Sequence, residues 1–168
     1  MPTVKPISQV VAGLIIAAAM IAAHIGIHVS GNFLNTTAVY LGYLPLPLGL
    51  LYFVRRHAHA QGTGATFGNL FAYGFRITAV VIVIMVIYAA LFYTVLPQYK
   101  DRIMEASMKA QEFGNKQTID DEAGTEKLAR RDDHFIQWTV SFTLFRLLFI
   151  GALSSLLAAA VSPKHAKS

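Results

Sequence analysis

Four long stretches of apolar residues constrain this chain more than any other feature. They cover residues 7–29, 37–54, 67–96 and 135–161, and the first two contain no charged residue. A helix needs about 20 mostly apolar residues to cross the roughly 30 Å hydrocarbon core of a bilayer. Charged residues make up only 14% of the chain, against about 25% in an ordinary soluble domain. The sequence therefore predicts an all-α polytopic membrane protein, a bundle of four transmembrane helices forming a single domain over residues 1–168.

The first apolar stretch has an alternative interpretation as a cleaved signal peptide. Lys5 precedes it and small residues lie near its end, as in secretory signals. The stretch is longer than the usual apolar region of such signals, and three more apolar stretches follow it. We therefore favour a first transmembrane span.

Charge is distributed very unevenly along the chain. All nine acidic residues lie between Asp101 and Asp133, and segment 97–133 also holds seven basic residues. The other seven basic residues are scattered around the apolar stretches, where there is no acidic residue at all. A nucleic-acid surface would instead cluster basic residues and interleave them with aromatic ones, so we expect no nucleic-acid partner.

The scattered basic residues predict an orientation. Lys5 precedes the first span, the run from Arg55 to His59 follows the second, and Lys164 and Lys167 follow the fourth. Because Lys and Arg favour the cytoplasmic side, both termini are expected in the cytoplasm of a bacterium. Segment 97–133 then lies outside the cytoplasmic (inner) membrane.

Segment 97–133 carries helix signals of its own. Pro97 suits a first helical turn, Gly114 suits a stop, and apolar residues recur at helical spacing between them: Tyr99, Ile103, Ala106, Ala110 and Phe113. A second helix follows, weakened at Gly124, with the option of running directly into the fourth span. The pattern predicts an extramembrane helical segment between spans three and four.

Three features together resemble a known family. They are the short second span with its two prolines, the basic segment leading into the stretch TFGNLFAYGF at 66–75, and the acidic, Met-containing segment that begins at Pro97. The chain resembles the small four-span bacterial inner-membrane proteins classed as domain of unknown function 4199, mostly from Bacteroidetes. The resemblance implies the fold and the membrane location, and it implies no activity and no site residues.

Arg146 is the sharpest candidate for a site. It lies about 12 residues into the fourth span, so about 18 Å deep at 1.5 Å per residue, where a charge costs about 2.5–3.5 kcal/mol or more. Pro45 and Pro47 each remove the helical donor to a carbonyl four residues earlier. In one interpretation the guanidinium donates to those carbonyls, on Leu41 and Tyr43. In the other, it binds an anion such as a lipid phosphate, a carboxylate solute or an acid of a partner subunit.

Arg76 is the second candidate for an anion or lipid site. It lies near the start of the third span, on one predicted helical face with Asn69 and Tyr73. A long basic side chain at the edge of a span can reach the interface while its stem stays in apolar surroundings. We expect this anchoring role for Arg76, with a second arm of an anion site as the alternative.

A metal site is a weaker hypothesis. His24 and His28 are four residues apart on the first span, and His134 follows Asp133 at the start of the fourth. Three imidazoles and a carboxylate at one depth are ligands that suit Zn²⁺ or another divalent metal. Buried or interfacial packing of these histidines is the simpler interpretation. We expect no cofactor, because haem b would need facing histidines deep in two spans.

No recognisable catalytic motif is present in the sequence, neither a nucleotide-binding glycine loop nor a metalloprotease or Ser/His/Asp pattern. The sequence therefore predicts a non-enzymatic accessory, scaffold or complex subunit that contacts the lipid bilayer and a membrane-protein partner or a second copy. The alternative is a small transporter or a lipid- or anion-binding protein centred on Arg146.

Overall fold

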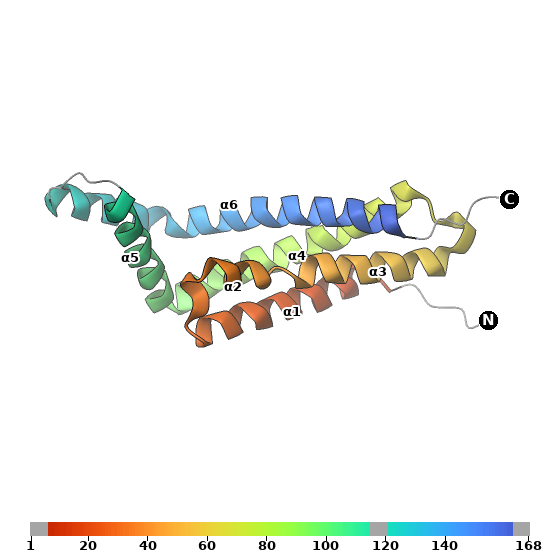
Figure 1. Ribbon diagram of the computed structural model, residues 1–168, viewed down its shortest axis with the longest axis horizontal. Helices are drawn as coiled ribbons and strands as arrows, with labels where there is room; N and C mark the ends of the chain where they lie inside the picture. The colour runs from red at the N-terminus through yellow and green to blue at the C-terminus, as the bar shows by residue number, and fades with distance from the viewer. Residues whose placement is uncertain (1–6, 115–120, 163–168) are drawn as a thin grey trace. The chain divides into compact units, whose positions relative to one another are not determined.

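The computed structural model describes the backbone of residues 7–114 and 121–162, and the side chains of 7–106 (Thr63 excepted) and 134–162. Every regular element in these ranges is a helix (Figure 1), which confirms the all-α prediction. The elements are α1 (Gln9–Val29), η1 (Asn32–Leu34), α2 (Thr36–Leu41), α3 (Pro45–Gln61), η2 (Gly62–Gly64), α4 (Phe67–Val95), α5 (Pro97–Gly114) and α6 (Asp121–Val161), of which η1 and η2 are single 3-10 turns.

Four helical segments of the described residues are long and apolar enough to cross a membrane, as the hydropathy pattern predicted. They are Gln9–Val29, Thr36–Gln61, Phe67–Val95 and His134–Val161. The second consists of α2 and α3, and it is longer than the predicted span over 37–54. Helical hydrogen bonding continues past the apolar residues, so the run from Arg55 to His59 lies in α3 rather than in a loop.

Side-chain caps mark the start of three helices. Ser8 Oγ accepts the amide of Val11 at 3.2 Å to open α1, and Thr66 Oγ1 accepts the amide of Asn69 at 3.3 Å at the start of α4. Asn35 caps α2, where its Oδ1 accepts two amides at 3.0 and 3.3 Å. These caps satisfy amides that a helix start otherwise leaves without partners.

Contacts group the chain into two compact units. The first contains residues 1–85 and 144–168, and the second contains residues 86–143. In the first unit, α1 and α3 lie beside the first part of α4 and the last part of α6 (Figure 1). The residues of this unit include seven Lys and Arg and no Asp or Glu.

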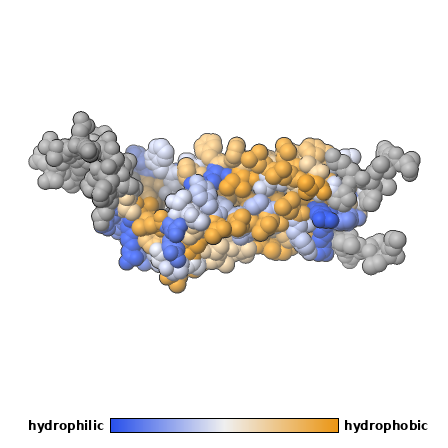
Figure 2. All heavy atoms as spheres, viewed as in Figure 1, coloured by the Kyte–Doolittle hydropathy of each residue, from blue (hydrophilic) through white to orange (hydrophobic). Residues whose placement is uncertain are grey.

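The core of the first unit is built from one face of each long helix. The largest fully buried side chains are Met20 of α1, Leu46, Leu50 and Val54 of α3, Leu70, Ile77 and Val81 of α4, and Leu147 of α6. The opposite faces are also apolar, as the broad hydrophobic surface in Figure 2 shows. An apolar exterior around an apolar core is what a helix bundle in lipid requires.

Small residues bring α4 and α6 into close contact. Gly74 and Thr78 on α4 face Gly151 and Ser155 on α6, so each helix presents two small residues four apart. A Cβ atom at Gly151 would overlap Thr78 Cγ2, and one at Gly74 would lie 3.0 Å from Ser155 Oγ. Thr78 Oγ1 donates to the Gly74 carbonyl at 3.1 Å and lies 3.4 Å from Ser155 Oγ. This is the spacing that lets membrane helices approach closely.

Glycines make two further helix contacts of the same kind. A Cβ atom at Gly13 of α1 would lie 2.6 Å from Val80 Cγ1 of α4. One at Gly49 of α3 would lie 2.5 Å from Ile16 Cγ1 of α1. Close glycine contacts therefore join α1, α3, α4 and α6 of the first unit, at positions that a larger residue does not fit without rearrangement.

The second unit contains the end of α4, α5 and the first part of α6. Phe92 of α4 stacks on Tyr99 of α5 with ring centroids 5.6 Å apart. Tyr93 meets Phe135 of α6 edge to face at 5.4 Å. Aromatic contacts of this kind contribute about 0.5–1.5 kcal/mol each beyond the area they bury. The first holds the start of α5 against α4, and the second joins α4 to α6.

Helix α5 follows the sequence signals closely. It begins at Pro97 and ends at Gly114, and Tyr99, Ile103 and Ala106 of the predicted apolar stripe are half-buried. The side chains of Ala110 and Phe113 and the predicted connection at 115–120 lie outside the described residues. Helix α6 starts at Asp121 and continues without a break into the fourth span.

Candidate functional site

Arg146 lies on α6 in the first unit and is half-buried. Its Nη1 donates to the hydroxyl of Tyr43 at 3.3 Å. Its Cζ lies 5.2 Å from the ring centroid of Tyr43 and 5.5 Å from that of Tyr40. The guanidinium therefore lies against two aromatic rings and one phenol, all from the region where the second span is broken.

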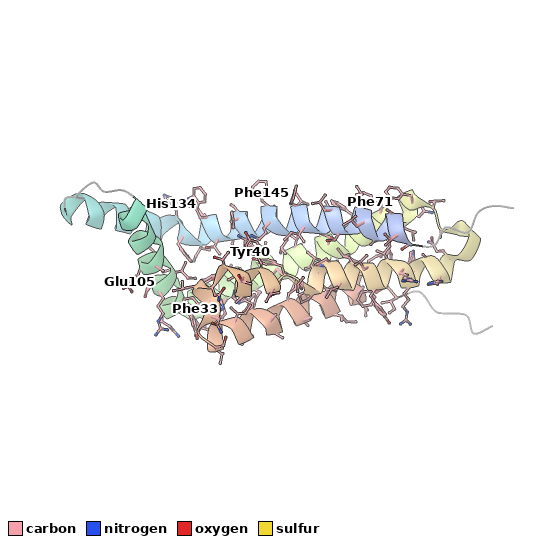
Figure 3. All side chains as sticks on the ribbon, in the orientation of Figure 1. Phe33, Tyr40, Phe71, Glu105, His134 and Phe145 are labelled. Carbon is pink, nitrogen blue, oxygen red and sulfur yellow. The ribbon has the colours of Figure 1, made fainter. Side chains whose placement is uncertain are left out.

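The break between α2 and α3 positions these tyrosines. Helix α2 ends at Leu41, and the chain passes through a tight turn before Pro45 opens α3. Tyr40 lies in the last turn of α2 (Figure 3), and the amide of Tyr43 donates to its carbonyl at 3.0 Å. Because the two residues are three apart on a helical turn, both rings can face the same neighbour on α6.

The backbone of this turn corrects one premise of the sequence analysis. The carbonyl of Leu41 accepts the amide of Leu44 at 3.1 Å, and the carbonyl of Tyr43 accepts the amide of Leu46 at 3.1 Å. Tighter turns thus replace the helical donors that Pro45 and Pro47 would remove. These carbonyls do not depend on Arg146, and the tyrosine side chains are the contacts that tie it to the break.

Energetically, this arrangement suits a cation placed inside a membrane. A cation over an aromatic face gains about 0.5–2 kcal/mol, more when water is excluded. The combined stabilisation from two such faces and a phenol hydroxyl is comparable with the cost of about 2.5–3.5 kcal/mol for an arginine at the centre of a span. The site can therefore hold α6 to the second span, and its half-buried guanidinium can also donate to an anion.

Arg76 of α4 has an exposed side chain, whereas Tyr73 on the predicted shared face is buried. It lies between Gly74 and Thr78, which pack against Ser155 and Gly151. Arg146 precedes Gly151 by five residues on α6, about 7.5 Å at 1.5 Å per residue. The two arginines therefore lie at different levels of the first unit.

The two histidines of α1 lie against each other. The rings of His24 and His28 lie 4.1 Å apart, and His28 also stacks on Phe33 of η1 at 5.4 Å (Figure 3 labels Phe33). His28 Nδ1 donates to the His24 carbonyl at 2.9 Å. The two imidazoles therefore contact each other, and His28 also contacts the neighbouring turn of the first unit.

The remaining predicted metal ligands belong to the second unit. His134 is exposed, with its Nδ1 3.1 Å from Gln137 Oε1, and the side chain of Asp133 lies outside the described residues. Among the side chains that are described, no three His, Cys, Asp or Glu residues are grouped to hold a metal ion. The four-residue metal site stays a prediction.

One polar cluster was missed from the sequence. The ring of His57 stacks on Tyr73 at 3.8 Å, with 3° between the planes, and the Tyr73 hydroxyl donates to the Ile7 carbonyl at 2.7 Å. These contacts join the end of α3, the start of α4 and the start of α1. His57 follows Leu50 and Val54 at helical spacing, and this is the sequence signal that places it on the same helix.

Four membrane-length helices, joined by small residues and by polar contacts within the spans, define a multi-pass membrane protein. The chain belongs to the family described as protein of unknown function (DUF4199), which matches residues 10–164. The resemblance inferred from the sequence is thereby confirmed. None of the curated proteins and none of the solved structures compared with the chain matches it.

Proposed function

We propose that this chain is a non-enzymatic integral protein of the bacterial cytoplasmic membrane, an accessory or scaffold subunit of a membrane complex. One observation carries the proposal: polar side chains within the spans of the first unit are used to join helices. Arg146 contacts Tyr43, Tyr73 donates to the Ile7 carbonyl, and Thr78 lies beside Ser155.

Contacts of this kind favour a rigid bundle. Polar groups are costly in lipid unless they are satisfied, and here the partner of each belongs to another segment of the first unit. The glycine contacts at Gly13, Gly49, Gly74 and Gly151 leave the helices little room to slide. A transporter of alternating-access type needs one part of the bundle to move against the other, so the close packing supports a structural role.

The orientation belongs to the same proposal. The end of α3 carries Arg55, Arg56, His57 and His59, and it lies at the same end of the first unit as the start of α1 and the end of α6 (Figure 1). Basic residues next to a span favour the cytoplasmic side. We therefore place both termini in the cytoplasm, with α5 on the opposite side of the membrane.

Native mass spectrometry tests the subunit proposal. The tagged chain, expressed at its natural level and purified in a mild detergent, is expected to retain a membrane protein or a second copy at fixed stoichiometry. Loss of that partner on truncation of an exposed side chain of α6, as in Phe145→Ala, with unchanged thermal stability, would strengthen the assignment. A monomer without a protein partner at every detergent concentration tested would contradict it.

The second candidate is an anion-binding protein centred on Arg146, and the half-buried position of its guanidinium against two tyrosines favours it. Under this candidate Arg146→Lys keeps part of the binding because it keeps the charge, while Arg146→Gln and Arg146→Met abolish it. Under the structural role, Arg146→Lys is poor because an ammonium lacks the planar fork. Retention of a small anion by wild type but not by Arg146→Gln would favour this candidate over the first.

A further inference from the structure

The outer face of α3 carries an open groove of about 500 Å³, lined by Tyr52, Arg55, Arg56 and His59. These residues follow one another at steps of three, one and three along the helix, so they share one face. Phe53, Val54 and Ala58 on the other face are buried in the first unit. The groove therefore opens away from the bundle.

The groove offers hydrogen-bond donors to an anion. Arg56 Nη1 donates to the Tyr52 hydroxyl at 3.3 Å, which holds the guanidinium beside that ring. Arg56 Nε is buried and has no hydrogen-bond partner among the described residues, while Arg55 and His59 are exposed. A planar guanidinium donates two parallel hydrogen bonds to phosphate or carboxylate oxygens.

No acidic side chain of the first unit can neutralise these cations, because residues 1–85 and 144–168 contain no Asp or Glu. The same fact argues against a zwitterionic headgroup, whose amine would find no carboxylate in this unit. The charge of the groove is complementary to an anionic headgroup such as that of phosphatidylglycerol.

The order of residues along α3 matches the order of groups in a phospholipid. Leu44, Leu48 and Leu51 precede the groove and are exposed by 45%, 61% and 37%. Tyr52 follows, with an apolar ring and a polar hydroxyl of the kind enriched at membrane interfaces, and the arginines come last. Figure 2 shows hydrophilic side chains gathered at this end of the first unit beside an apolar surface.

We propose that this groove binds one anionic phospholipid. Its phosphate accepts hydrogen bonds from Arg55 and Arg56, and its acyl chains lie along the exposed leucines of α3. The inference concerns a lipid partner and is independent of the subunit role, so either can fail without the other. A helix C-terminus also favours cations through its dipole, which would explain the basic residues without a bound lipid. The experiment below distinguishes this explanation from lipid binding.

The test is lipid titration of the purified full chain in detergent, read by native mass spectrometry and by thermal unfolding. Dioleoyl phosphatidylglycerol is expected to bind as one adduct, to raise the unfolding temperature, and to bind at least about tenfold more tightly than dioleoyl phosphatidylcholine. Arg56→Gln should weaken phosphatidylglycerol binding about tenfold, the loss expected for a charge-assisted hydrogen bond. Arg102→Gln on α5, which removes one arginine outside the groove, is the control and should leave binding unchanged.

Three outcomes would overturn the proposal. They are equal binding of the two lipids, equal loss of binding in Arg56→Gln and Arg102→Gln, and stabilisation by inorganic phosphate alone to the same extent as by phosphatidylglycerol. If Arg56→Gln fails to fold, Arg55→Gln and Arg56→Lys test the same hydrogen bonds. Unchanged binding in both of these would contradict the proposed geometry.

Discussion

At the scale of single residues, Arg146 brings a positive charge into the fourth span, and two tyrosines at a helix break contact it. The depth of Arg146 was readable from the sequence because charged residues in apolar spans are rare. Its partners were not, because Tyr40 and Tyr43 look like ordinary residues of an apolar helix. Identifying them requires knowing which face of the second span meets α6, and hydropathy does not encode that.

A double-mutant cycle tests this contact. Tyr43→Phe removes the hydroxyl and keeps the ring, and Arg146→Gln removes the charge and keeps most of the length. We expect a coupling of about 1 kcal/mol between the two substitutions, because hydrogen bonds to charged groups in contact pairs couple at this level. Unfolding of the four proteins in one detergent measures it, and strictly additive effects would contradict the contact.

The hydroxyl of Tyr73 gives a second prediction at this scale. It donates to the Ile7 carbonyl at 2.7 Å and so fixes the start of α1 to α4. Tyr73→Phe keeps the ring that stacks on His57 and should cost about 1 kcal/mol. Amide hydrogen exchange should accelerate in the first turn of α1 and stay unchanged at the end of α6. Faster exchange in both places would mean that the substitution loosens the whole first unit instead.

At the scale of elements, the sequence predicted which segments are helical better than where the second span ends. Hydropathy marks the change from apolar to charged residues at Arg55, whereas α3 continues to Gln61. The helix ends there because the next residue, Gly62, takes a positive φ of 54°. The signals at Pro97 and Gly114 worked because they act on the backbone itself. Pro45 and Pro47 indicated a disturbance of the second helical span. They did not indicate that a tight turn supplies backbone donors to the Leu41 and Tyr43 carbonyls.

The contact between α4 and α6 gives a prediction for whole helices. Gly151→Ala puts a Cβ atom into Thr78 and should cost about 1–3 kcal/mol, as overpacking does elsewhere. Thr78→Ala removes the obstructing methyl and should recover part of the loss. Gly26→Ala on α1 is the control, since nothing lies within 4 Å of that position, and alanine favours a helix over glycine. Equal effects at Gly151 and Gly26 would contradict the close approach.

At the scale of the whole molecule, the number of spans was predictable because the bilayer imposes its thickness on the sequence. The four stretches identified from hydropathy correspond to the four membrane-length segments of the described residues. The helix contacts were less predictable. The small-residue spacing at Gly151 and Ser155 was visible, but its partners Gly74 and Thr78 lie about 77 residues away, as the Thr78–Ser155 pair shows. No local pattern identifies such a pairing.

The central claim is that the chain crosses the membrane four times with both ends in the cytoplasm, and cysteine labelling tests it directly. The chain contains no Cys, so Ser30→Cys, Gln61→Cys, Lys109→Cys and Lys167→Cys each create a single reactive site without further changes. A membrane-impermeant maleimide added to spheroplasts should label Ser30→Cys and Lys109→Cys, and should label the other two only after lysis. The reverse pattern, or labelling of adjacent sites from the same side, would contradict the account.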